Sequence, residues 1–152
     1  MFNAAQVHLG LNHLPLGFVL VGFPLLAVAL LRRSAELKTT ACVLLILSAL
    51  AAIPTFFSGE PAEELVEHRS GVSKMVIHEH EEAGELAAIL SGVLGGLALA
   101  AWLFEKLRRP LPSVAWWGLV LFGAVSLGIL IRTAHLGGLI RHEELAAPAE
   151  KS

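Results

Sequence analysis

The sequence lacks most of the features by which soluble enzymes and secreted domains are recognised. Its 152 residues include one cysteine, Cys42, which excludes an intrachain disulfide, a paired-cysteine metal site and a CxxCH haem attachment. No serine or cysteine stands beside a base as a nucleophile would, and no glycine-rich loop has the pattern of a nucleotide site. The net charge of −2 gives no sign of a nucleic-acid partner. No catalytic residue is predicted, so whether the chain is an enzyme stays open.

Apolar side chains, in contrast, are abundant and lie in long uncharged runs. They make up 55% of the chain. Each run holds 18 or 19 residues, close to the roughly 20 that a helix needs to cross a bilayer. The four predicted spans are 14–31, 39–57, 86–104 and 114–131. The sequence therefore predicts an all-α fold, an integral membrane antiparallel four-helix bundle in which residues 1–152 form one membrane domain.

The charged residues between the spans predict an orientation. Arg32, Arg33 and Lys38 follow the first span, and Lys106, Arg108 and Arg109 follow the third, whereas the segment 59–85 is rich in glutamate. Basic loops stay in the cytoplasm. We therefore expect the acidic segment and both termini to face the periplasm from a bacterial inner (cytoplasmic) membrane. No basic residue precedes the first span, so we expect no removable signal peptide.

The outward segment 59–85 has helical patterns of its own. Residues 61–68 read as two helical turns, and after Ser70-Gly71 the apolar Val72, Met75 and Val76 share one face of a second short helix. We expect this segment to lie over the mouth of the bundle as an amphipathic lid.

All seven histidines fall on the outward side of this map. They are His8, His13, His68, His78, His80, His135 and His142. Neutral imidazole is the commonest metal ligand, and helical bundles build cofactor sites from residues on facing helices. Glu64 and His68, and likewise His78 and Glu82, are spaced i, i+4, which lets two side chains share a cation.

Three interpretations of these histidines stay open. They can be interfacial polar residues of a structural or assembly subunit that has no cofactor. They can hold haem b between two imidazoles over an apolar bundle interior. They can instead form a His/Glu site for zinc, copper or non-haem iron, which the HEHEE stretch at 78–82 favours.

Several motifs together resemble a known group of proteins. These motifs are residues 8–15 (HLGLNHLP), 58–64 (SGEPAEE), 66–68 (VEH), 80–83 (HEEA) and 132–143, which runs from RTAHLGG to RHE. The chain is similar over almost its whole length to small bacterial four-helix membrane proteins related to the domain-of-unknown-function family numbered 2231. The resemblance implies the architecture rather than an activity. It also implies that His8, His13, His68, His80 and His142 match family histidines, while His78 and His135 are additions.

From these observations we expect a haem b-binding electron-transfer subunit in the lipid bilayer. His13 and His80 begin the first and third spans, on diagonal helices, and are the favoured haem ligands. His68 and His142 are the next candidates. The candidate ligands for a non-haem metal are His8, His13, His68, His80, His142, Glu64 and Glu82. The expected partners are a redox protein or a larger membrane complex.

Overall fold

A computed structural model describes residues 4–64 and 73–141, and these residues contain helices and no strand. The helices are α1 (Ala4–Leu11), α2 (His13–Arg32), α3 (Ala35–Phe57), α4 (Gly59–Glu64), α5 (Lys74–Lys106) and α6 (Ser113–Arg141). The predicted all-α fold is confirmed. His68 and His142 lie outside the described residues.

Four stretches of helix are long and apolar enough to cross a membrane, as the sequence predicted. They are Gln6–Arg32, Ala35–Phe57, Lys74–Lys106 and Ser113–Ile140. Their outer surfaces carry large apolar side chains, among them Leu121, which is 69% exposed, and Leu97, which is 50% exposed. Apolar surface on this scale is unfavourable in water and suits a lipid environment. The chain is a multi-pass membrane protein by this criterion.

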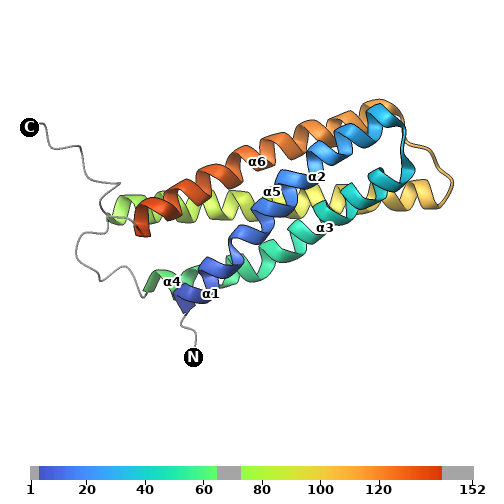
Figure 1. Ribbon diagram of the computed structural model, residues 1–152. Coiled ribbons are helices and arrows are strands. Elements are labelled where there is room, and N and C mark those ends of the chain that lie inside the picture. Colours follow the sequence, from blue (N-terminus) through green and yellow to red (C-terminus); the bar gives the residue numbers. More distant parts are fainter. Residues whose placement is uncertain (1–3, 65–72, 142–152) are drawn as a thin grey trace, which may run out of the picture.

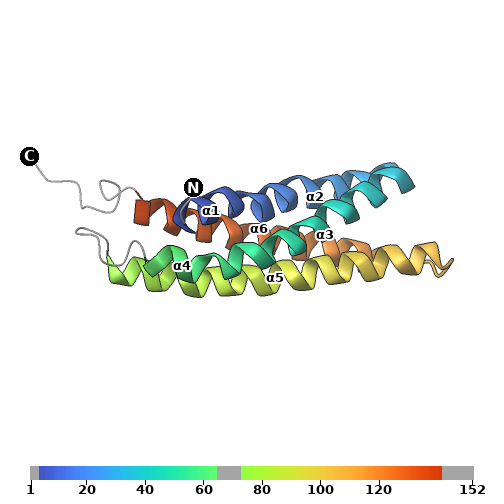
Figure 2. The same cartoon turned by 90° about the horizontal axis from the view of Figure 1, so that it is seen from below.

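Contacts join α2 to α3, α3 to α5, α5 to α6 and α6 back to α2, so the four long helices enclose one core (Figures 1 and 2). Three glycines let neighbouring helices approach closely. A Cβ on Gly95 would overlap Ala49 of α3, one on Gly22 would lie 2.9 Å from Leu45, and one on Gly123 would lie 2.6 Å from Phe23. Small residues allow this contact where no hydrophobic force draws helices together in lipid.

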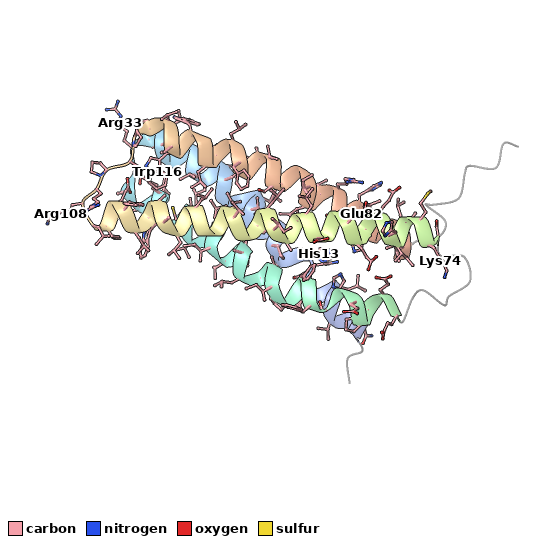
Figure 3. All side chains as sticks on the ribbon, turned by 180° about the vertical axis from the view of Figure 1, so that it is seen from behind. His13, Arg33, Lys74, Glu82, Arg108 and Trp116 are labelled. Carbon is pink, nitrogen blue, oxygen red and sulfur yellow. The ribbon has the colours of Figure 1, made fainter. Side chains whose placement is uncertain are left out.

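The two ends of the bundle differ in charge. Arg33 and Arg108 lie at one end, while Lys74 and Glu82 lie at the other (Figure 3). At the basic end, Lys38 of α3 pairs with Glu105 of α5, and its ammonium group lies 4.8 Å from the ring centre of Trp116 on α6. This cluster joins three helices at that end.

At the other end, α1 contacts α4, beside the start of α5 and the end of α6 (Figure 1). Much of the segment expected to form a lid is instead helix that adjoins a span. The helix α5 begins at Lys74 and runs unbroken into the apolar segment, and α4 follows α3 directly after Ser58. Residues 65–72 lie outside the described residues, so closure of the mouth by a lid stays a prediction.

Candidate functional site

A cavity of about 810 Å³ opens at the histidine-bearing end of the bundle. Residues of all six helices, α1 to α6, line it. Five carboxylates line it near this end of the bundle: Glu60, Glu63, Glu81, Glu82 and Glu85. The deeper lining is apolar and comprises Leu16, Ala52, Ala87, Ala88 and Leu130, with Ser91. This volume lies within the range of cofactor and small-molecule sites.

His8 enters the cavity from α1, with its ring orientation fixed by the end of α3. Because α3 ends at Phe57, no backbone N–H from a later turn of α3 is available to bond the carbonyl of Thr55. His8 Nδ1 donates to this carbonyl at 3.2 Å and lies 3.0 Å from Ser58 Oγ, whose hydroxyl itself donates to Thr55 O. Both oxygens accept from Nδ1, so Nδ1 bears the hydrogen, and Nε2 of the neutral ring has a free lone pair.

His80 enters from α5 and is held in the same way by α6. Its Nδ1 donates to the carbonyl of Thr133 at 3.0 Å. The Thr133 hydroxyl donates to Ala83 O and to Ile129 O, each at 3.0 Å, which ties α6 to α5 beside the ring. Gly137 of α6 leaves space for the His80 ring, because a Cβ at this position would lie 3.1 Å from His80 Cε1. The Nε2 lone pair of neutral His80 is therefore free as well.

The two rings lie close together at this end of the bundle, edge to face. The ring centres of His8 and His80 are 6.3 Å apart, and the ring planes are nearly perpendicular at 88°. With metal–nitrogen bonds of about 2.0 Å and about 1.1 Å from nitrogen to ring centre, imidazoles on opposite sides of one metal have centres about 6.2 Å apart. At a tetrahedral angle the same bonds would bring the centres to about 5 Å. The observed separation is that of an edge-to-face pair of rings, and two imidazoles at this spacing would be able to hold one bound group together.

His13, the favoured partner of His80 in the sequence analysis, begins α2 and also lines the cavity (Figure 3). Its Nδ1 donates to Leu9 O, four residues earlier, at 2.9 Å, and its side chain is exposed. The histidine whose ring contacts His80 is His8. The predicted clamp by His13 and His80 stays a prediction.

The other candidate residues lie nearer the surface. His78 is exposed and lies 3.4 Å from Glu82 and 3.7 Å from Glu81, so the predicted i, i+4 contact between His78 and Glu82 is present. Glu64 is exposed at the end of α4, and His135 is exposed on α6. Within residues 4–64 and 73–141, no three His, Cys, Asp or Glu side chains are grouped as ligands of one metal ion.

Sequence reasoning did not find the groups that orient the two imidazoles. Thr55 and Thr133 act through their backbone carbonyls, which no residue pattern reveals. Ser58 and Gly137 had a weak signal, since both lie in motifs that carry the family resemblance. Their roles depend on which helices are neighbours, and this emerges only in three dimensions.

Comparisons of the chain with protein-family models, with curated proteins and with solved structures find no match. The resemblance described above therefore rests on its motifs, and the site has to be interpreted from its own geometry.

Proposed function

We propose that this protein binds haem b between His8 and His80 and serves as an electron-transfer subunit of the bacterial inner membrane. One observation carries the proposal: two imidazoles on different helices lie 6.3 Å apart at a large cavity, each with Nδ1 bonded to a backbone carbonyl. A hydrogen bond at Nδ1 is the usual means of orienting a ligating histidine and raising its basicity.

The ligand set favours haem over a bare metal ion. A porphyrin supplies four equatorial nitrogens, so the protein needs to add two axial ligands in trans and an apolar slot. His8 and His80 would serve as this pair, and apolar residues such as Leu9, Phe56 and Ile77 line the same cavity. Zinc in a structural site takes four protein ligands and in a catalytic site three. No such group exists within the described residues.

The charge around the cavity mouth bears on the partner. Glu60, Glu81 and Glu82 are exposed there. A negative rim attracts a positively charged protein and speeds its association. We propose a basic redox protein on the periplasmic side as the partner, with one electron passed to or from the haem iron.

A non-haem site is the second candidate, and the glutamates around the mouth favour it. In this proposal Glu64, Glu82 and the five histidines that match the family resemblance, two of them outside the described residues, hold zinc, copper or iron. The cofactor-free assembly subunit is the third candidate, since Met75, at the start of α5, is 69% exposed and could meet a protein partner.

The absorption spectrum of the detergent-purified protein distinguishes these candidates. Haem b gives a Soret band that sharpens and shifts on reduction with dithionite, with one haem per chain in a pyridine extract. A colourless protein with stoichiometric zinc, copper or iron by elemental analysis would contradict the haem proposal and support the second candidate. Neither metal nor haem would support the third.

A further inference from the structure

Ser91 of α5 is a polar residue that the haem proposal does not use. Its side chain is fully buried, and its hydroxyl has no hydrogen-bond partner. A helical serine or threonine ordinarily donates to the carbonyl four residues earlier. In this chain Thr40, Thr55, Ser126 and Thr133 do so, to Glu36, Ala51, Phe122 and Ile129 respectively. Ser91 departs from this pattern.

The surroundings of Ser91 are apolar and belong to the cavity. Ser91 lines it together with Leu16 of α2, Ala52 of α3, Ala87 of α5 and Leu130 of α6, which are uncharged residues from all four long helices. An unpaired hydroxyl in such a place costs about 1–3 kcal/mol. A ligand that offers a hydrogen-bond acceptor would remove this cost.

A second unpartnered polar atom lines the same cavity. Asn12, between α1 and α2, has a buried Oδ1 without a hydrogen-bond partner. Its backbone N–H bonds to His8 O at 2.9 Å, so Asn12 lies one helical turn after His8. The cavity therefore offers polar groups beyond the two imidazoles.

The position of Ser91 separates it from the histidines. Ser91 follows His80 by eleven positions of continuous helix, and at about 1.5 Å per residue this is about 16 Å along α5. One small ring cannot contact both residues. A small ligand at the deep end of the cavity would therefore contact Ser91 and not the two histidines.

We propose that this deep end of the cavity binds the ring carbonyl of a quinone, with Ser91 as the hydrogen-bond donor. Three features select this class of ligand: the lining around Ser91 is apolar, it lies among membrane-spanning helices, and the unpartnered Ser91 hydroxyl can donate to a neutral acceptor. A lipid-soluble ring with carbonyl oxygens meets all three. An ester carbonyl of a phospholipid offers the same acceptor, and the test below separates the two. The proposal goes beyond haem binding and does not depend on it.

The test is calorimetric titration of the detergent-purified protein with a short-chain ubiquinone. We expect saturable binding of one quinone per chain. Ser91→Ala should weaken it about fivefold, the value of one hydrogen bond. Ser126→Ala is the matched control and should leave the affinity unchanged, because Ser126 is equally buried and its hydroxyl is already bonded to Phe122 O.

Four results would overturn the proposal. They are no saturable binding, an unchanged affinity in Ser91→Ala, equal binding of an analogue whose carbonyls are replaced by methyl groups, and loss of quinone binding when phospholipid is added. The same samples are examined by absorption spectroscopy. If the protein binds quinone but contains no haem, only the haem proposal is contradicted. If it contains haem but binds no quinone, only the quinone proposal is contradicted.

Discussion

At the scale of single residues, the site depends on groups that hold the two imidazoles rather than on the imidazoles alone. A free histidine ring has two tautomers and several rotamers. The carbonyl of Thr55 selects one for His8, and the carbonyl of Thr133 selects one for His80. Each carbonyl belongs to a neighbouring helix, so the orientation of the two rings is set by helix packing.

Gly137 gives a direct test of this positioning. In Gly137→Ala the new Cβ would press on His80 Cε1 from 3.1 Å, so we expect the ring to shift and haem occupancy to fall several-fold. Stability should not fall with it, because alanine is favoured over glycine in a helix by about 1 kcal/mol. The measurements are Soret absorbance per chain and the thermal unfolding temperature.

Gly138→Ala is the control for this variant. No atom lies within 4 Å of the position that its Cβ would take, so haem occupancy should stay at the wild-type value. If the two variants retained haem equally, Gly137 would have no role in placing His80.

At the scale of the helices, neighbouring helices pack closely at glycines in the core, while the end that carries the histidines contains a cavity. A Cβ added to Gly95 of α5 would meet Ala49 and the Leu45 carbonyl of α3, whereas one added to Gly96 would have no other helix within 4 Å. A backbone carbonyl moves less easily than a side chain. The contact between α3 and α5 therefore has little tolerance for added volume.

Gly95→Ala should destabilise the protein by about 1–3 kcal/mol, since overpacking forces the two helices apart. Gly96→Ala should be neutral or stabilising by up to about 1 kcal/mol. Unfolding of both variants in detergent, followed by circular dichroism with increasing dodecyl sulfate, measures the difference. Equal stability of the two would show that α3 and α5 do not approach as closely as described.

The sequence predicted the presence of the four long helices better than the positions of their ends. The apolar run 14–31 lies within α2, whose bounds are His13–Arg32. The run 86–104 lies within α5, which begins twelve residues earlier, at Lys74. An apolar run in the sequence ends at the first charged residue. A helix continues past charged residues where one of its faces is buried, and Ile77 and Ala83 are buried on this part of α5.

The ring contact between His8 and His80 could not be predicted from the sequence. Position along the chain gave His13 and His80 as the starts of two spans. The ring contact between His8 and His80 depends on α1 nearly continuing α2, and on the end of α3 offering a carbonyl. These are tertiary relations, and no spacing in the sequence encodes them.

At the scale of the whole molecule, the opposite charges of the two ends predict how the protein lies in the membrane. The end with Arg33 and Arg108 should face the cytoplasm, and the end with Glu82 should face the periplasm (Figure 3). This orientation would place the cavity within reach of periplasmic partners.

Cysteine labelling tests the orientation. The buried Cys42 is first replaced by alanine, and Met75→Cys or Leu107→Cys is then introduced, since each of these positions is 69% exposed. A membrane-impermeant maleimide should label Met75→Cys in cells with a permeabilised outer membrane, and Leu107→Cys only after the inner membrane is disrupted. The reverse pattern would invert the topology.

The central proposal, axial ligation of haem by His8 and His80, is tested most directly by low-temperature electron paramagnetic resonance of the oxidised protein. The wild type should show a low-spin ferric signal typical of two imidazole ligands. His8→Ala and His80→Ala should each lose it, and His135→Ala should keep it, because His135 is exposed and does not line the cavity. An unchanged low-spin signal in both His8→Ala and His80→Ala would contradict the assignment.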